Sequence, residues 1–202
     1  MTAMFEDRIN PFAARFVRPG AVEYLSCGGA DPQLLAMRLE QQGWVGEIVG
    51  PHGAGKSALL AALIAQLRAK GRDVLPIELH EGDRRLPADA FAPPSPRWRL
   101  IAVDGAEQLG WWAWLRLRLF VRRRAWGLVV TSHRSLGLPP LASLKPDADL
   151  AWRIVQQLQA NDPLITQAET TAAFSAHRGN LREMLFDLYD RYQARLEQRE
   201  RR

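Results

Sequence analysis

Gly50-Pro51-His52-Gly53-Ala54-Gly55-Lys56-Ser57 is the stretch that decides the fold of this chain. It matches G-x-x-x-x-G-K-[ST], the phosphate-binding loop called Walker A, at every fixed position. The apolar residues 45–49 before it are typical of a short strand, and the apolar residues at helical spacing after it, up to Leu67, predict a helix. Because a strand, a glycine-rich turn and a helix follow one another as the motif requires, the sequence predicts a nucleotide-binding loop.

Each residue type in this loop has a physical reason to be there. We expect Gly50, Gly53 and Gly55 to take positive φ angles and to let the backbone N–H groups approach phosphate oxygens closely. The helix that begins at Lys56 adds its N-terminal dipole to the same site. Lys56 is expected to reach the β- and γ-phosphates, and the Ser57 hydroxyl is expected to ligate Mg²⁺. All eight residues of the stretch are candidate nucleotide-binding residues.

A second apolar run, Leu100-Ile101-Ala102-Val103, ends in the carboxylate of Asp104. This is the Walker B pattern, although ordinary strand ends share it. One predicted strand, residues 73–79, precedes this run, and Pro76 within that strand predicts an edge position or a bulge. At the end of its own strand, Asp104 is expected to lie beside the P-loop and to hold Mg²⁺ through a water, together with Ser57.

Three glutamates are candidates to orient the water that attacks a γ-phosphate. Glu107 lies one helical turn beyond Asp104, and a glutamate in that position is equally favoured by a helix dipole. Glu78 and Glu81 follow the predicted strand 73–79, and they compete with Glu107 by the same positional logic.

Polar side chains also end the predicted buried strand 126–133, in the order Thr131-Ser132-His133. A residue that senses the γ-phosphate is expected at Thr131 or Ser132, because the carboxyl end of this strand would emerge next to the P-loop and to Asp104. A plain polar strand end accounts for the same residues. Thr131 is the candidate catalytic residue of this strand.

The predicted helix 107–125 is rich in tryptophan and arginine. An amphipathic helix that buries its tryptophans and leaves its arginines in water accounts for this composition. Interleaved aromatic and guanidinium groups are also typical of nucleic-acid binding by stacking and phosphate contact. An arginine finger within 122–124, reaching the γ-phosphate of a neighbouring subunit, is a further alternative. The arginines concerned are Arg116, Arg118, Arg122, Arg123 and Arg124.

The N-terminal residues 1–31 carry turn signals around a few apolar side chains and no repeating face. They predict an irregular segment in which Phe12 and Phe16 pack on the core. A helix over 32–42 is predicted to follow, because Asp31 stands where an N-cap is needed and a proline occupies the first helical position.

Beyond the second strand, the prolines of residues 80–97 predict a loop. Residues 138–146 predict a connection that holds a short last strand. The rest of the chain is predicted to be helical, with one helix starting at 161–163 and a last helix starting at Asn180, where Asn180 and Glu183 have the spacing of a capping box.

Length and composition restrict the class of protein. The chain has 202 residues, of which 47% are hydrophobic, so it has enough apolar side chains for the core of one domain with a small appendage. It shows neither an apolar run near membrane-spanning length nor a secretory leader, and we expect a cytoplasmic protein with no membrane partner. A single cysteine, Cys27, excludes an internal disulfide and fits a reducing compartment. The net charge of +5 fits an anionic partner or an arginine-rich composition alone.

Taken together, the motifs resemble the AAA+ group of P-loop ATPases, within the class that has an extra strand between the Walker strands. The resemblance covers about residues 32–190. It implies ATP bound between the sheet and a helical lid, with Arg182 of Gly179-Asn180-Leu181-Arg182 touching the γ-phosphate. Two departures matter: Asp104-Gly105 stands where the family has an acidic pair, and the lid after residue 147 is short. Slow hydrolysis, or a nucleotide switch, is therefore compatible with the sequence.

The sequence thus predicts a three-layer α/β P-loop NTPase domain with a mainly parallel sheet over residues 32–147, and a helical lid with a basic tail over 148–202. We expect it to bind ATP and Mg²⁺ and to hydrolyse ATP to drive a conformational change. No N-K-x-D motif for guanine is present. A nucleic-acid-binding regulator that uses ATP as a ligand and a small-molecule phosphotransferase are the alternatives, and a homo-oligomer or a protein partner is compatible with each.

Overall fold

The computed structural model describes residues 10–20, 24–26, 29–91 and 99–201. Contacts divide the chain into two compact units: residues 26–145 form one unit, and residues 1–25 with 146–202 form the other. Cys27 falls outside the described residues.

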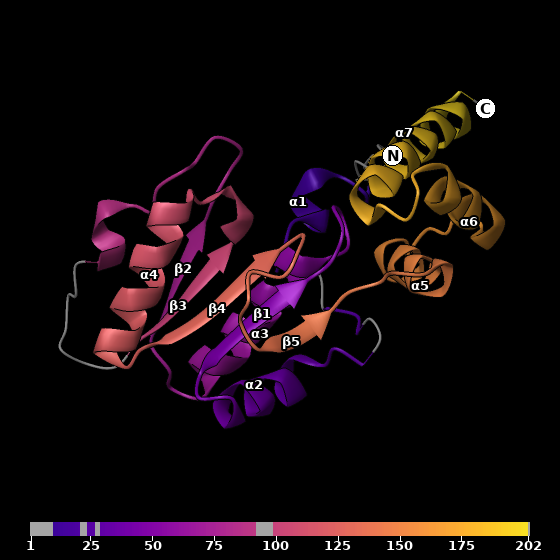
Figure 1. Cartoon of the computed structure of the whole chain (residues 1–202). Helices are drawn as coiled ribbons and strands as arrows, with labels where there is room; N and C mark the ends of the chain where they lie inside the picture. The colour runs from indigo at the N-terminus through magenta and orange to yellow at the C-terminus, as the bar shows by residue number, and fades with distance from the viewer. Residues whose placement is uncertain (1–9, 21–23, 27–28, 92–98, 202) are drawn as a thin grey trace, which may run out of the picture. The chain divides into compact units, whose positions relative to one another are not determined.

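The unit of residues 26–145 is built on a five-stranded sheet in which every described pairing is parallel (Figure 1). The order of the strands is β2-β3-β4-β1-β5, so β4 separates β1, which leads into the P-loop, from β3, which ends at Asp104. This confirms the α/β class and the extra strand between the Walker strands. The strands are β1 (Val45–Val49), β2 (Val74–Glu78), β3 (Leu100–Asp104), β4 (Gly127–Ser132) and β5 (Pro140–Ser143).

Burial on both faces explains why the sequences of the inner strands β3 and β4 are largely apolar. All six residues of β4 and the first four of β3 are buried, as expected for parallel strands covered by helices on both faces. Strand β2 is at the edge of the sheet and is partly exposed. Pro76 therefore lies in an edge strand, which confirms the prediction from its missing N–H group.

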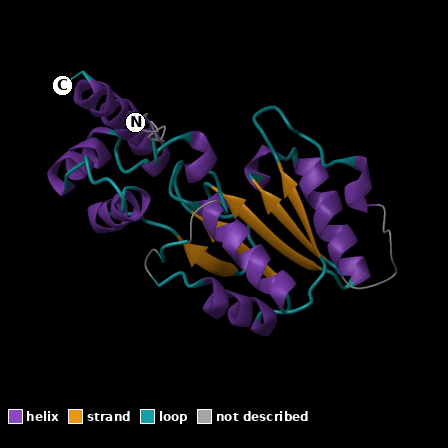
Figure 2. Cartoon of the chain, turned by 180° about the vertical axis from the view of Figure 1, so that it is seen from behind, coloured by secondary structure: helices purple, strands orange, loops and turns teal. Residues whose placement is uncertain are grey.

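Helices cover the sheet on its two faces. Helix α4 (Trp111–Arg124) packs Leu117 and Val121 against a core that includes Ile101 and Val130. Helix α3 (Lys56–Ala69) contacts four of the strands and is seen across the sheet in Figure 2, with α2 (Pro32–Gln41) packed beside it. The order of helix, sheet and helix gives the predicted three layers.

Local signals placed several helix ends correctly. The Asp31 carboxylate accepts hydrogen bonds from the N–H groups of Gln33 at 2.7 Å and Leu34 at 3.1 Å, so it is the N-cap of α2. The predicted helix 107–125 is wrong at its start. The chain instead forms a short 3-10 turn, η2 (Ala106–Gln108), and α4 begins only at Trp111. Another short 3-10 turn, η1 (Ala88–Phe91), lies within the predicted loop 80–97.

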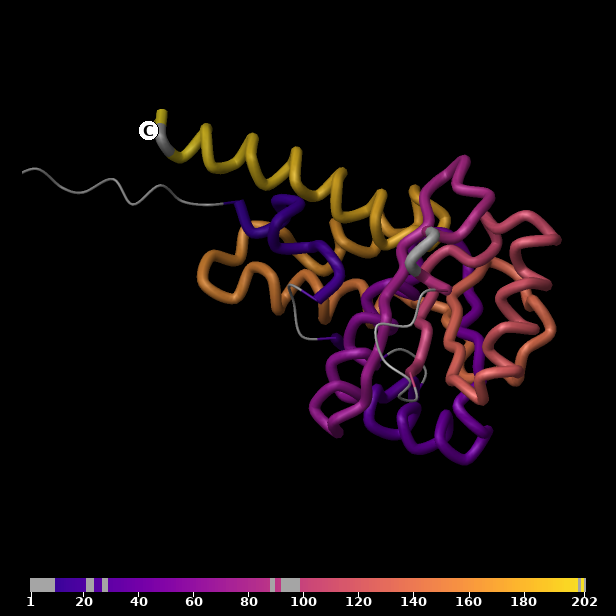
Figure 3. Tube along the Cα trace, turned by 90° about the vertical axis from the view of Figure 1, so that its left-hand side faces the viewer, coloured from indigo at the N-terminus to yellow at the C-terminus, as the bar shows by residue number. Residues whose placement is uncertain are grey.

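The other unit is helical. Its N-terminal part, with the short α1 (Ala14–Val17), runs beside α7 (Leu181–Glu200), as Figure 3 shows. Phe12 is 1% exposed and its ring centroid lies 5.5 Å from that of Tyr192. Asn10 Nδ2 donates to the carbonyl oxygen of Tyr189 at 3.0 Å. The packing expected of Phe12 is therefore made against α7.

The predicted helix start at 161–163 is wrong. Helix α5 (Ala148–Leu158) is followed by a loop, and α6 (Gln167–Ala176) begins after Thr166. The buried side chain of Gln159 supplies the loop's hydrogen bonds, accepting from the N–H of Ile165 at 2.9 Å and donating to its carbonyl at 2.6 Å. These bonds replace those that a helix would make.

Among the described hydrogen bonds, the capping box predicted at Asn180 and Glu183 forms only its N-cap half. Asn180 Oδ1 accepts from the N–H groups of Arg182 at 3.0 Å and Glu183 at 3.2 Å, which caps α7. The reciprocal box is described instead at Thr166 and Glu169, at the start of α6. Among the described helices, none is long and apolar enough to cross a membrane.

Candidate nucleotide site at the P-loop

Glycine is required at different positions of the P-loop for different structural reasons. Gly53 and Gly55 take the expected positive φ angles, 67° and 88°. Gly50 does not have a positive φ angle, so the expectation for that residue is wrong. What Gly50 requires is space, because a Cβ there would lie 3.0 Å from the carbonyl oxygen of Leu144. This close approach packs the start of the loop against the end of β5.

Lys56 opens helix α3 with a buried side chain that is 8% exposed. Its Nζ donates to the carbonyl oxygens of Gly50 and Pro51, each at 2.8 Å, and lies 3.1 Å from Nδ1 of His133. Burial lowers the pKa of Lys56, and the negative charges of Glu107 and Asp104 oppose that shift. In this structure the loop's own carbonyl groups hold the cation that is expected to meet phosphate.

His133 joins that lysine to the candidate base. Its Nε2 lies 2.7 Å from Oε1 of Glu107, and its ring stacks on His52, with centroids 3.4 Å apart. Because an ammonium group can only donate, Nδ1 of His133 accepts from Lys56 and Nε2 carries the proton that is donated to Glu107. Burial lowers the pKa of His133, and the charge of Lys56 lowers it further. A neutral imidazole therefore bridges the two charged groups.

Asp104 is held by the neighbouring strand. Thr131 Oγ1 donates to Asp104 Oδ1 at 2.5 Å and accepts from the N–H of Gly105 at 2.9 Å. The Thr131 side chain is fully buried. Ser132, the other predicted sensor, donates instead to the carbonyl oxygen of Arg134 at 2.7 Å. Of the two candidates on β4, Thr131 is therefore the one that contacts Asp104.

Backbone geometry explains why glycine follows Asp104 where the resembled family has a second acidic residue. Gly105 has a φ angle of 76°, and a Cβ there would lie 2.9 Å from the carbonyl oxygen of Leu79. The next carboxylate along the chain is that of Glu107, which lies in η2, one turn beyond Asp104. Its Oε1 contacts His133, while its Oε2 is buried and has no hydrogen-bond partner among the described residues. That atom is an acceptor available to a small polar ligand.

The competing glutamates lie elsewhere. Glu78 ends the edge strand β2, paired in register with Asp104, and its side chain is exposed, as is that of Glu81. Among the described contacts, none joins either residue to Lys56 or His133. Glu107 is the candidate that the fold brings to the P-loop lysine.

Ser57 and Asp104 offer a hydroxyl and a carboxylate, which are hard oxygen ligands suited to Mg²⁺. Ser57 is the second residue of α3, and Asp104 ends β3. Within the described part of the chain, no group of three or more His, Cys, Asp or Glu side chains forms a metal site by itself. A cation with few protein ligands that also binds phosphate oxygens fits this donor set.

Two further residues of this region have roles that the sequence analysis missed. Glu47 lies within β1, is 2% exposed, and accepts from the N–H groups of Leu136 at 2.8 Å and Leu138 at 3.4 Å, and from the Ser135 hydroxyl. It therefore fixes the loop that follows β4. His133, at the start of that loop, is the other, and its only sequence signal was its place at a polar strand end.

Arg182 belongs to the helical unit, where it lies in the first turn of α7. Its backbone N–H donates to the Asn180 cap at 3.0 Å. The expected contact of its guanidinium with a γ-phosphate remains a prediction.

Several solved structures are similar to this chain at low sequence identity. The replication initiator DnaA bound to AMPPCP and single-stranded DNA is 15% identical, with a TM-score of 0.57 over 88% of this chain and 66% of that one. The RuvB Holliday junction branch migration motor of Thermotoga maritima is 18% identical, with a TM-score of 0.55 over 82% and 61%. A Walker-type ATPase of Pyrococcus abyssi is 12% identical, with a TM-score of 0.52 over 77% and 65%.

No family model matches the sequence, and no curated protein matches it. The chain spans slightly less than two thirds of the length of the solved structures named above. At such identities the likeness shows the fold, which is the P-loop fold of AAA+-like ATPases. This confirms the fold resemblance drawn from the motifs.

Proposed function

We propose that this chain, which has the fold of the AAA+-like P-loop ATPases, binds ATP with Mg²⁺ and hydrolyses it to drive a conformational change. One observation carries the proposal: Lys56, His133 and Glu107 form a continuous chain of contacts beside the P-loop. A structural role alone would not require a buried lysine, a neutral histidine and a carboxylate to meet at a phosphate-binding motif.

Phosphate binding begins with Lys56. Its ammonium group exchanges the carbonyl oxygens of Gly50 and Pro51 for oxygens of the β- and γ-phosphates, which carry full negative charge. The N–H groups of the loop and the N-terminus of α3 stabilise the same charge. The buried position of Lys56 strengthens its attraction to phosphate, because little water screens it.

Ser57 and Asp104 would hold the metal, with Thr131 fixing the Asp104 carboxylate. Bound Mg²⁺ supplies neutralisation of the phosphate charge that develops during transfer. We assign Thr131 to positioning, because its buried hydroxyl already makes two hydrogen bonds to Asp104 and Gly105.

Glu107 acts as the general base in this proposal. Oε1 is held by His133, and Oε2, which is buried without a partner in the described part of the chain, accepts the proton of the attacking water. The contact with Nε2 of His133 fixes the orientation of the Glu107 carboxylate. Arg182 in the helical unit is proposed to stabilise the γ-phosphate, as the family resemblance implies.

Nucleotide binding and phosphate release, measured together, separate this proposal from its alternatives. We expect calorimetric titration to show tighter binding of ATP than of GTP, and a loss of affinity when EDTA removes Mg²⁺. Release of inorganic phosphate from ATP in the absence of any acceptor would then distinguish an ATPase from a phosphotransferase. A chain that binds neither nucleotide in the presence of Mg²⁺ would contradict the proposal.

A further inference from the structure

Helix α4 presents an unusual outer surface on the unit of residues 26–145. Its inner face buries Leu117 and Val121, whereas Trp111 is 65% exposed, Trp112 is 75% exposed and Leu119 is 45% exposed. Monomeric proteins rarely leave several large apolar side chains together in water, and such patches commonly mark interaction sites. The exposed tryptophans correct the expectation that this helix buries all of its tryptophans.

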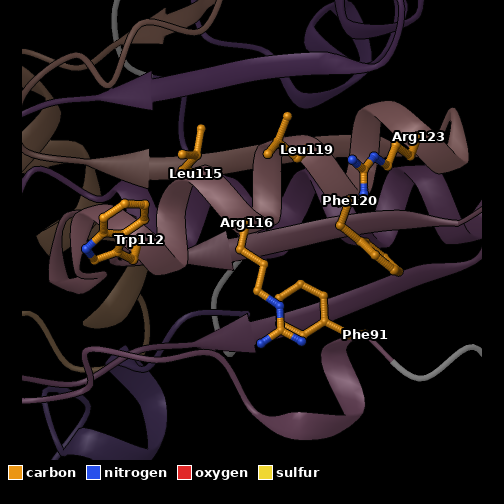
Figure 4. A pocket seen from close by; sticks show the side chains of 7 residues that line it. All are labelled: Phe91, Trp112, Leu115, Arg116, Leu119, Phe120 and Arg123. Carbon is orange, nitrogen blue, oxygen red and sulfur yellow. The ribbon is translucent and has the colours of Figure 1, made fainter.

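The exposed side of α4 is hollowed, as Figure 4 shows. Trp112, Leu115 and Leu119 follow one another at i, i+3 and i+7 along this side, which is the spacing that packs against another helix. Phe91 and Phe120 complete the apolar lining, and Arg116 and Arg123 add charge to it. We call this hollow, of about 520 Å³, the α4 groove.

All charged residues of helix α4 are positive. Helix α4 carries five arginines and no acidic residue, while the whole chain has 27 Lys and Arg against 22 Asp and Glu. Outside α4 the chain is therefore formally neutral. The last helical turn holds Arg122, Arg123 and Arg124, and the helix dipole stabilises cations at that end. The dipole does not account for Arg116 and Arg118, which lie earlier in the helix.

Among the described residues, none of these five arginines forms an ion pair. Three of them lie over aromatic rings instead. The Arg116 guanidinium carbon is 4.4 Å from the Phe91 ring centroid, and Arg118 and Arg124 lie 5.9 and 5.8 Å from the rings of Trp114 and Phe120. The guanidinium groups therefore remain open to carboxylates from a partner.

We propose that the α4 groove binds an amphipathic helix of a partner protein, one that carries an apolar stripe flanked by acidic residues. The stripe Trp112–Leu115–Leu119 receives the apolar side chains, and Arg116 and Arg123 pair with the carboxylates. Interface centres are enriched in the residue types found here, namely tryptophan, phenylalanine and arginine.

Two other occupants fit less well. A second copy of this chain using the same face would set arginines against arginines, which like charges oppose. Single-stranded nucleic acid needs open ring faces for stacking, but Arg116 covers Phe91, and Phe120 meets Phe91 and Trp126 edge to face. Trp111 and Trp112 also meet at 73°, so they do not form a parallel platform. Leu115 and Leu119 suit apolar side chains better than bases.

The test uses the full chain without nucleotide, so that its outcome does not depend on the proposed ATPase. The probe is a fluorescein-labelled helical peptide of about 20 residues, with leucines at i, i+3 and i+7 and flanking glutamates. A second peptide keeps the leucines and replaces each glutamate by lysine, and an oligothymidylate of similar length represents nucleic acid. Fluorescence anisotropy at physiological ionic strength measures all three affinities.

We expect the glutamate peptide to bind about tenfold or more tightly than the lysine peptide. The double substitution Arg116→Ala with Arg123→Ala should weaken it about fivefold or more, as should Leu119→Ser. The matched control, Arg118→Ala with Arg122→Ala, removes the same charge outside the groove and should change affinity less than about twofold. Circular dichroism checks that each variant keeps its fold.

Three results would overturn the proposal. One is failure of the glutamate peptide to bind below about 100 μM. Another is tight binding of the oligothymidylate that both double substitutions weaken equally, which would assign α4 to nucleic acid. The third is concentration-dependent self-association that Leu119→Ser abolishes, which would assign the groove to a second copy.

Discussion

Nε2 of His133 donates to Oε1 of Glu107 across 2.7 Å, while Nδ1 of the same ring accepts from Lys56 at 3.1 Å. The P-loop lysine and the candidate base are thus joined through one neutral ring. A ligand that draws Lys56 away from His133 changes the hydrogen bonding of the group that holds Glu107. Under the proposed function, these direct contacts would couple nucleotide binding to activation of water.

Replacing the P-loop lysine tests the binding half of the account. Lys56→Ala should weaken ATP binding by about tenfold or more, because a buried cation facing phosphate is lost. Lys70→Ala is the matched control, since Lys70 caps the exposed C-terminal end of α3. Isothermal titration measures both. Equal affinities for the two variants would remove Lys56 from the site.

The histidine bridge predicts how stability depends on pH. The pKa of His133 is lower in the folded chain than its ordinary value of 6.5, so the unfolded chain binds more protons as the solution is acidified through that value. The contribution of neutral His133 to stability is therefore full above about pH 6.5 and is lost as the pH falls below it. His133→Gln should remove this part of the pH dependence.

Thermal unfolding measured between about pH 7.5 and 5 checks this prediction. His80→Gln is the control, because the His80 side chain is exposed. A wild-type profile that has the same slope as that of His133→Gln would show that His133 does not titrate differently in the folded chain.

Gly105 has a predicted effect on stability that depends on two separate causes. Gly105→Ala should lower the free energy of unfolding by about 2–4 kcal/mol, because it places a Cβ at a positive φ angle and 2.9 Å from the Leu79 carbonyl oxygen. Gly137 has a similar φ angle, 79°, and open space where a Cβ would lie. Gly137→Ala should therefore lower the free energy of unfolding by only about 1 kcal/mol. Urea unfolding distinguishes strain alone from strain with a clash; equal losses would refute the close approach.

Thr131→Val tests the support of Asp104. It should lower the free energy of unfolding by about 1–3 kcal/mol, because the half-buried Gly105 N–H and the Asp104 carboxylate both lose a partner. The Mg²⁺ concentration needed for half-maximal ATP binding should also rise. Ser132→Ala removes a neighbouring hydroxyl that bonds only to Arg134 within the described contacts, and should leave the Mg²⁺ requirement unchanged.

The sequence predicted the parts of the fold that depend on local patterns. The P-loop, the buried strand ending at Asp104 and the edge position of Pro76 follow from residue types at fixed spacing. Where contacts outside the motifs decide, whether distant or nearby in the chain, the predictions were wrong. Gly50 needs space beside Leu144 and has no positive φ angle, and the segment before Thr166 takes its hydrogen bonds from Gln159.

The candidate site, like the fold, was predicted only where local sequence patterns determine it. The Walker A and Walker B motifs themselves contain Lys56 and Asp104, and Glu107 follows Asp104 by three residues. His133 follows a polar strand end, and nothing local shows that its ring reaches Lys56, far earlier in the chain. Glu47 gave no signal within its strand, because its role depends on a loop that begins beyond β4. Such contacts become visible only when the sheet order is known.

The most direct test of the central claim compares phosphate release from ATP by the wild type, Glu107→Gln and the exposed control Glu81→Gln, with nucleotide binding measured in parallel. The account predicts that Glu107→Gln lowers turnover by about 10²–10⁴-fold while ATP binding is kept, and that Glu81→Gln behaves as the wild type. Turnover that survives in Glu107→Gln would contradict the assignment of the base. A wild type that binds ATP and never releases phosphate would contradict the hydrolase itself.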